Sequence, residues 1–148
     1  AVKEVCWVDE FHDLARASGR SEGVSLDNTY NARYAEYLFR VRGATNDWLS
    51  YAASGAVREA RVTAFFAPAQ GPVAEPRFLA SRDGQTFEAV TPSKRAERAH
   101  IAPPHRGNQH RQTQVDYTLA PPPGTRHIKI VWSGAMALDR VELSHPGR

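Results

Sequence analysis

The Asp83-Gly84 pair is the sequence feature that most constrains how this chain can fold. It lies in the segment Arg82–Gln85, between the apolar, β-rich runs Phe78–Ser81 and Thr86–Val90. An Asp-Gly pair supplies the positive φ angles that a tight hairpin turn needs. The sequence therefore predicts a β-hairpin here, and a hairpin needs further strands to complete a sheet with a buried face.

Similar short runs recur along the chain and bring the total to about nine predicted strands. They are Lys3–Phe11, Tyr34–Val41, Trp48–Tyr51, Val57–Phe66, Gln114–Leu119, His127–Trp132 and Leu138–Leu143. A helix competes for the first half of Val57–Phe66. The run IKIVW (128–132) is apolar on both sides, which suits a central strand. The pattern predicts an all-β fold, an antiparallel β-sandwich of the jelly-roll type.

Composition agrees with a single domain over residues 1–148. The chain has 16.4 kDa, ten prolines and one methionine, which argues against a helical bundle. Cys6 is its only cysteine, so no internal disulfide and no cysteine metal cluster can form. The longest apolar run covers only residues 64–69, too short for a membrane span. No leader pattern opens the sequence, so we expect any signal peptide to be absent or already removed.

Positive charge is concentrated in residues 91–111. This stretch carries five basic residues against Glu97, a net of +4, whereas the whole chain has a net charge of +3. With its prolines and glycine it is expected to be a loop. Two interpretations stay open, an anion-binding loop or an ordinary solvated surface loop.

Counting alternate strand directions predicts which loops share an end of the sandwich. The turn at 82–85 should lie with 53–56 and 120–125. The opposite end should collect 42–47, 67–76, 91–111 and 133–136, together with 12–22 if residues 23–27 form a short strand. Long loops on rigid strands commonly build binding surfaces, so the second end is the expected site.

Several segments resemble galactose-binding-like β-sandwich domains, and specifically carbohydrate-binding modules. PRFLASRDGQTFEAV is similar to their Ser-x-Asp-Gly hairpin, and QVDYTLAPPPGTRHIKIVW and ALDRVELSH to their last strands. The opening VDEFHDLARASG, followed by YLFRVRGATNDWLSYAA, is similar to the start of such modules. The resemblance implies a secreted bacterial, non-catalytic sugar-binding module, often with structural calcium, joined to a polysaccharide-degrading enzyme.

Sugar binding needs an aromatic platform with polar groups beside it. Trp7 and Trp132 are expected in the core, whereas Trp48 could pack inward or face a sugar, and Tyr30 with Tyr34 could form an edge platform. Arginine suits carboxylates because its planar fork binds them in a bidentate manner. The candidate ligand-binding residues are Arg42, Asn46, Asp47, Trp48, Lys94, Arg95, Arg98, His100, Arg106, Asn108, Gln109 and Arg111.

Metal binding has one candidate set. Calcium takes six to eight oxygen ligands, and Asp9, Glu10 and Asp139 lie on terminal strands that the resemblance places side by side. They are the candidate ligands for a structural Ca²⁺. The histidines at 100, 105 and 110 are less suited to zinc, since Pro103 and Pro104 interrupt their spacing.

No motif for catalysis is present, so a binding role is favoured over an enzyme. The expected ligand is a polysaccharide, with the basic stretch favouring an anionic one such as xanthan or a uronate-containing glycan. One alternative is a nucleic-acid-binding domain, although the basic stretch has no aromatic residue to stack on bases. A small polysaccharide lyase or hydrolase and a spacer domain without a ligand are the others.

Overall fold

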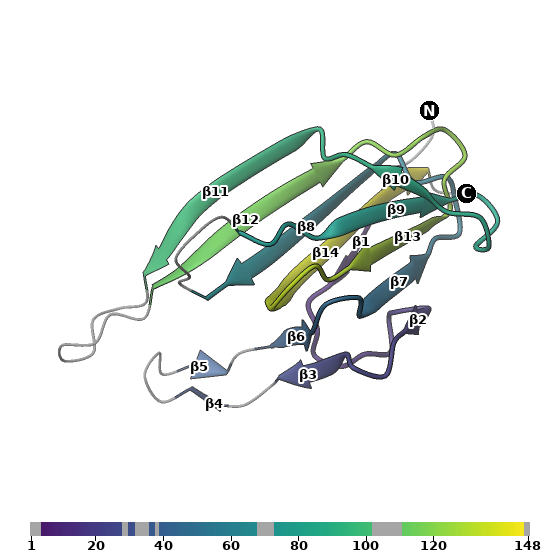
Figure 1. Cartoon of the computed structure of the whole chain (residues 1–148). Helices are drawn as coiled ribbons and strands as arrows, with labels where there is room; N and C mark the ends of the chain where they lie inside the picture. Colours follow the sequence, from purple (N-terminus) through teal and green to yellow (C-terminus); the bar gives the residue numbers. More distant parts are fainter. Residues whose placement is uncertain are drawn as a thin grey trace.

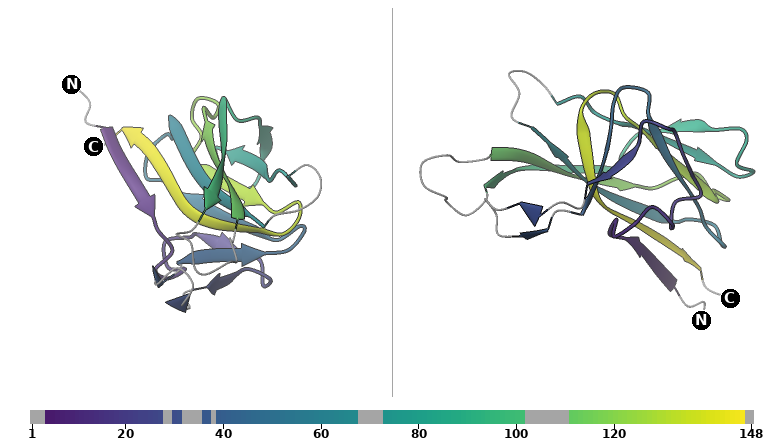
Figure 2. Two further views of the ribbon diagram at one scale, coloured as in Figure 1. Left: turned by 90° about the vertical axis from the view of Figure 1, so that its left-hand side faces the viewer. Right: turned by 90° about the horizontal axis from the view of Figure 1, so that it is seen from below.

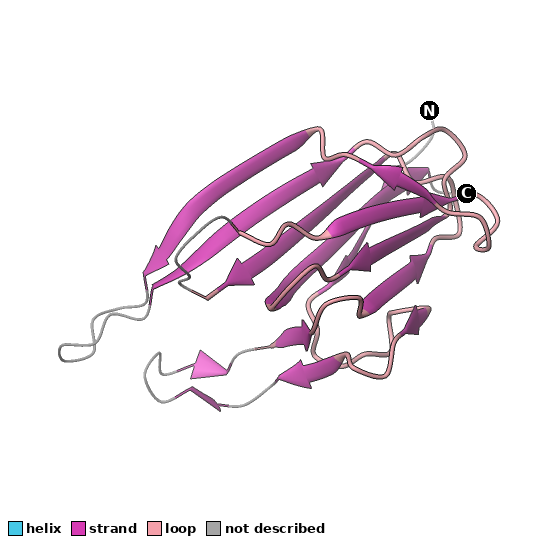
Figure 3. Cartoon of the chain, in the orientation of Figure 1, coloured by secondary structure: helices cyan, strands magenta, loops and turns pink. Residues whose placement is uncertain are grey.

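A computed structural model describes residues 4–27, 30–31, 36–37, 39–67, 73–101 and 111–146. Strands and turns make up all of this part of the chain (Figures 1 and 3). The strands form two antiparallel sheets, and a short separate pair is formed by β4 (Tyr30–Asn31) and β5 (Glu36–Tyr37). The predicted all-β sandwich is therefore confirmed. In the described residues, no helix is long and apolar enough to cross a membrane.

The larger sheet has seven strands and contains both ends of the described chain. Its order is β11 (Lys94–Ile101), β12 (Arg111–Leu119), β8 (Glu59–Phe66), β14 (Met136–Pro146), β6 (Arg40–Gly43) and β3 (Ser25–Asp27), with β1 (Glu4–Asp9) also paired to β14. Because Glu4 pairs with Pro146, β1 and the end of β14 lie side by side (Figure 2).

The smaller sheet has five strands. Its order is β10 (Glu88–Val90), β9 (Arg77–Ser81), β13 (His127–Val131), β7 (Trp48–Ala52) and β2 (Gly19–Arg20). β13 lies between β9 and β7, as the apolar run IKIVW predicts. β9 and β10 form the hairpin expected around Asp83-Gly84.

One core fills the space between the two sheets. Alternate residues of β7, β8, β12 and β13 face inward, among them Leu49, Val62, Tyr117 and Ile130, each with at most 1% of its surface exposed. Trp132 is fully buried, as expected. Trp7 is half-buried and packs against this core, with its ring centroid 5.4 Å from that of Tyr51.

The basic stretch differs most from the prediction. Residues 94–101, expected to be part of a loop, form strand β11, which pairs with β12 along its whole length. The side chains from Lys94 to Ala99 are all exposed, so the strand has no alternation of apolar and polar residues that the sequence could reveal. Strand Val57–Phe66 is confirmed as β8, beginning at Glu59, and the helical alternative is excluded.

The predicted division of the loops between two ends is confirmed for 53–56, 82–85 and 120–125 at one end and for 42–47 and 133–136 at the other, but it is wrong for 94–101, which run along the larger sheet as β11. At one end, the Arg126 amide donates to Ser81 O and the Ala53 amide to Arg126 O. At the other, the Asn46 amide donates to Trp132 O at 2.8 Å, which joins the loops 44–47 and 132–135. Residues 102–110, which belong to the predicted second end, lie outside the described residues.

The Asp83 turn is held by its own carboxylate. One carboxylate oxygen accepts hydrogen bonds from the Gln85 and Thr86 amides at 2.8 and 2.9 Å, and the Ser81 hydroxyl donates to it at 3.0 Å. Gly84 has a φ of 79°, as the Asp-Gly signal predicts. The hydrogen bonds from the Thr86 and Gln85 amides lower the pKa of Asp83 from 3.8 to about 2.

We expect this turn to make folding sensitive to acid. Because the folded-state pKa of Asp83 is depressed, its contribution to stability is present above about pH 4 and is lost as pH falls through about 2. Asp83→Asn keeps an oxygen acceptor and removes the titration. Urea unfolding at pH 6, 4, 3 and 2 should show the advantage of the parent over the variant shrinking below pH 4. An equal difference in the free energy of unfolding between parent and variant at pH 6 and pH 2 would contradict this prediction.

Candidate functional site

The outer face of the five-stranded sheet carries two aromatic rings beside a lysine. In β7, Leu49 and Tyr51 point into the core, so Trp48 points outward; in β13, Ile128 and Ile130 point inward, so Lys129 points outward. Phe87 precedes β10 and reaches the same lysine. We call Trp48, Phe87 and Lys129, with Arg77, Ser50 and His127 of the same face, the aromatic–basic face.

Lys129 lies between the two rings. Its Nζ is 4.6 Å from the ring centroid of Trp48 and 4.3 Å from that of Phe87. Both distances are within the range of a cation–π contact. Lys129 forms no ion pair with any residue that the structure describes. Its charge is thus held in place by aromatic rings and left without a carboxylate.

Strand register shows which residues share this face. Paired residues on antiparallel strands point to the same side. The three rows across the face are Arg77–Val131–Trp48, Leu79–Lys129–Ser50–Gly19 and Ser81–His127–Ala52. The rows contain two cationic residues and a histidine, and neither Asp nor Glu. The face therefore favours a ligand with negative charge.

A glycine of the neighbouring strand β2 fixes the position of Trp48. A Cβ on Gly19 would lie 3.2 Å from the nearest Trp48 ring atom and 3.0 Å from the Ser50 hydroxyl oxygen. A side chain at position 19 would therefore crowd both the indole and the Ser50 hydroxyl. The Ser18 and Ser50 hydroxyls are 3.2 Å apart and place polar groups beside the ring.

The predicted loop 42–47 supports Trp48 rather than forming a separate site. The Asp47 carboxylate accepts hydrogen bonds from the Ser21 hydroxyl and the Ala44 amide, both at 2.8 Å. The Ala44 amide, and then Ser21, lower the pKa of Asp47 below its ordinary value. Asn46 adopts a positive φ of 72° in the turn. Asp47 and Asn46 thus shape the loop, and Arg42 is exposed beside them.

The basic residues predicted to bind the ligand at 94, 95 and 98 do not lie beside Trp48. Lys94, Arg95 and Arg98 lie on β11 in the other sheet. Arg95 is engaged by Glu75, which raises its pKa above the ordinary value, and also by Glu97. The Arg98 guanidinium lies 3.8 Å from the Asp116 carboxylate.

The other predicted residues of this stretch divide into two groups. His100 and Arg111 belong to β11 and β12 by their backbones. Arg106, Asn108 and Gln109 lie outside the described residues, as does Tyr34 of the alternative aromatic platform. The expectation of one basic loop facing 42–47 is therefore wrong for Lys94, Arg95 and Arg98. These three residues are part of strand β11 at the edge of the larger sheet.

Each of the three candidate calcium ligands contacts a different set of partners. Asp9 is buried and accepts hydrogen bonds from the Phe11 amide at 3.0 Å and the Tyr51 hydroxyl at 2.9 Å. Glu10 lies 3.7 Å from Arg140, and Asp139 lies 3.6 Å from Arg40. In the described part of the chain no group of three or more His, Cys, Asp or Glu could hold a metal ion. This arrangement gives the calcium prediction no support.

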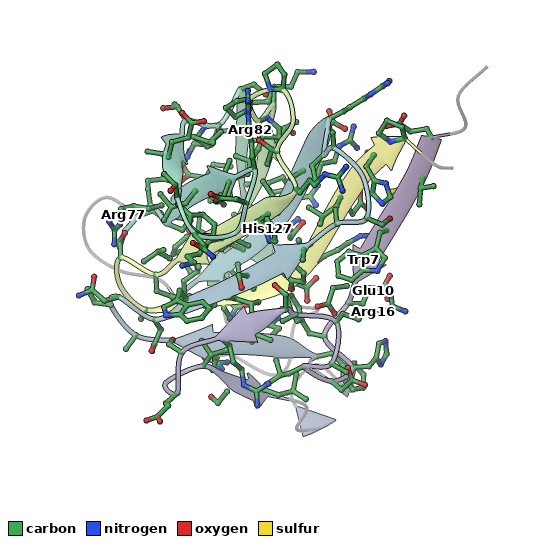
Figure 4. All side chains as sticks on the ribbon, turned by 90° about the vertical axis from the view of Figure 1, so that its right-hand side faces the viewer. Trp7, Glu10, Arg16, Arg77, Arg82 and His127 are labelled. Atoms are coloured by element: carbon green, nitrogen blue, oxygen red, sulfur yellow. The ribbon has the colours of Figure 1, made fainter. Side chains whose placement is uncertain are left out.

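A hollow of about 510 Å³ lies beside β1. Trp7, Glu10 and Arg16 gather there, on the other side of the molecule from Arg77 (Figure 4). Arg16 covers the Trp7 ring at 5.7 Å and donates to Val8 O at 2.8 Å. The Arg16 guanidinium already has a partner, and acidic residues line the hollow. The hollow is therefore a weaker candidate for a binding site than the aromatic–basic face.

Trp48 is among the residues predicted from the sequence, whereas Lys129 and Phe87 are not. A signal for Lys129 was available, because it is the only charged residue in the apolar run IKIVW. In a central strand whose alternate residues fill the core, such a lysine must point to the outer face.

Comparison with known proteins agrees with the architecture. No protein-family model matches the sequence, and no curated protein matches it. A family 6 carbohydrate-binding module has 14% identity and a TM-score of 0.52, over 94% of this chain and 93% of its own. The C-terminal family 6 module of LamC, a laminarinase of Zobellia galactanivorans, has 14% identity and a TM-score of 0.50, over 94% and 98%.

The chain has the β-sandwich fold of carbohydrate-binding modules. This confirms the fold that the resemblance of the hairpin and the last strands implies. The K2 cleaved adhesin domain of Lys-gingipain also has this fold, with 10% identity and a TM-score of 0.57 over 94% of this chain and 99% of its own. Since one fold carries many functions, the ligand has to be argued from the site.

Proposed function

We propose that this protein is a non-catalytic module that binds a polysaccharide, and that the polysaccharide is anionic. The observation that carries the proposal is Lys129, a cation held between Trp48 and Phe87 without an acidic partner among the described residues. An acidic sugar offers a carboxylate for the lysine and an apolar ring face for the indole. Xanthan and uronate-containing glycans have this chemistry.

The proposed contacts divide by chemistry. Trp48 stacks against the sugar ring, because an aromatic face binds the C–H groups of a pyranose. Lys129 and Arg77 bind carboxylate or pyruvyl oxygens, for which charge-assisted hydrogen bonds are the stronger kind. The Ser50 and Ser18 hydroxyls, 3.2 Å apart, reach sugar hydroxyls. The face needs no metal for these contacts.

We further propose that the module is secreted and holds an attached catalytic domain near its substrate. The C-terminal module of a laminarinase, which has the same fold, supports this role. A non-catalytic role fits the engagement of the acidic residues Asp47, Asp116 and Glu59. They are bound by Ser21, Thr63 and Arg61, respectively.

Affinity electrophoresis tests this proposal. The chain should be retarded by xanthan or polygalacturonate, release no reducing ends or unsaturated uronates, and lose retention at high salt, because exposed ion pairs are screened over about 8 to 10 Å.

Lys129→Ala should weaken binding to the acidic polymer about 10- to 100-fold, the size of one lost charge-assisted hydrogen bond. Trp48→Ala should weaken binding to every polymer that binds.

Arg98→Ala is the matched control, because it removes an exposed cation from β11 and leaves the aromatic–basic face intact. It should bind like the parent. If Arg98→Ala loses binding and Lys129→Ala does not, the glycan lies on β11 and the proposed site is wrong. Salt-insensitive binding to neutral glucomannan would contradict the anionic ligand, and product release would contradict the non-catalytic role.

A further inference from the structure

Strand β11 forms an open edge of the larger sheet. It pairs with β12 over eight residues, from Lys94 with Thr118 to Ile101 with Arg111. Among the described strands it pairs with no other, and it runs along the margin of the sandwich (Figure 1). Its outer side therefore presents backbone N–H and C=O groups that pair with no described strand, and such groups are a template for another strand.

Side-chain burial does not explain why β11 is so long. All side chains from Lys94 to Ala99 are exposed, so this part of the strand contributes little to the core. Natural proteins usually keep edge strands short or cover them, and five to six residues is the commonest strand length. Eight residues is long for an edge strand in which the side chains of Lys94–Ala99 have no packing role.

The charges on β11 differ between its two faces. Arg95 and Glu97 pair with each other, and Arg95 also pairs with Glu75. Lys94 and Arg98 share the other face, separated by the small residue Ala96. Lys94 forms no ion pair with a described residue, and Arg98 is an exposed partner of Asp116 at 3.8 Å. This face of the edge is therefore cationic.

The cationic face of β11 disfavours a second copy of the chain. Antiparallel pairing of two β11 strands about Ala96 places Lys94 directly opposite Arg98 of the other copy, and like charges in this position are destabilising. The same register places Arg95 opposite Glu97, but both of these residues already have ion-pair partners within the chain. An acidic strand would instead meet both cations. Repulsion of the wrong partner together with attraction of the right one is how interfaces achieve specificity.

A peptide fits this edge better than a glycan does. β11 contains no aromatic residue, and its neighbours across the ladder on the cationic face are Thr118, Asp116 and Gln114, so no ring is available for a sugar. An extended peptide repeats at about 3.3 Å per residue, which matches the free backbone groups. We propose that β11 is a docking edge for an extended acidic peptide, which binds by adding a strand to the larger sheet.

Fluorescence anisotropy with the whole chain tests this. The probe is a labelled peptide of valine and threonine with two glutamates four residues apart, so that both acids lie on one face of a strand. We expect saturable binding and NMR shifts at the β11 amides. The double variant K94E/R98E should bind this peptide at least about 10-fold more weakly. It should instead bind a second peptide in which lysines replace the two glutamates. Both positions are exposed, and thermal unfolding checks that the variant folds.

Three controls separate this proposal from its rivals. Arg82→Glu, an exposed arginine in the β9–β10 turn, should bind the acidic peptide like the parent. A peptide N-methylated at alternate residues should not bind; equal binding would show attraction of charge alone and overturn strand addition. Failure of the unmodified peptide to bind, or loss of polygalacturonate binding in K94E/R98E, would also overturn the proposal.

Discussion

Replacing Trp132 by alanine is expected to lower the free energy of unfolding by about 3 to 5 kcal/mol. The side chain is fully buried, and its Nε1 donates a hydrogen bond to Met136 O at 2.8 Å. Gly43 packs so closely that a Cβ there would lie 3.0 Å from the indole. Alanine would leave a cavity that these neighbours cannot fill. Urea unfolding followed by circular dichroism measures the loss.

Trp132→Phe serves as the matched control. It keeps a large ring in the core and removes the hydrogen bond to Met136 O, so we expect a smaller loss of about 1 to 3 kcal/mol. A Trp132→Ala variant within about 1 kcal/mol of the parent would contradict the assignment of this indole to the core. Polysaccharide binding should survive in Trp132→Phe, because the ring does not reach the aromatic–basic face.

The part of the fold that could be predicted is the part with local signals. Asp83-Gly84 fixes a turn through backbone geometry, and IKIVW marks a central strand because apolar residues lie on both sides. β11 could not be predicted in this way. Its hydrogen bonds to β12 are made by the backbone, and the side chains of Lys94–Ala99 are exposed on both faces, so neither alternation nor apolar content distinguishes this part of the strand from a loop.

The site was harder to predict because sheet pairing assembles it. Trp48 faces outward because Leu49 takes the inward position in β7. The sequence alone left open which of these two neighbouring residues points into the core. Lys129 and Phe87 are 42 positions apart in the chain, and they meet only because β13 pairs with β9 and β9 with β10. Charge density along the sequence pointed instead to 91–111, where the structure engages Arg95 with Glu75.

The buried pair of Asp9 and Tyr51 gives the second large effect. Tyr51 is fully buried and its hydroxyl donates to Asp9 at 2.9 Å, while the other Asp9 oxygen accepts from the Phe11 amide. Burial raises the pKa of Tyr51 well above its ordinary value of 10.0, and the charge of Asp9 raises it further. The interaction joins β1 of one sheet to β7 of the other, and it exists only while the phenol keeps its proton.

Tyr51→Phe should therefore lower the free energy of unfolding by about 1 to 3 kcal/mol near pH 7, because the Asp9 oxygen loses its donor inside the core. Above pH 10 the unfolded chain releases the Tyr51 proton and the folded chain retains it. The contribution of Tyr51 is therefore complete below pH 10 and declines as pH rises. Urea unfolding at pH 7, 9, 10 and 11 should show the parent losing stability faster than the variant. Parallel declines would show that Tyr51 titrates alike in both states.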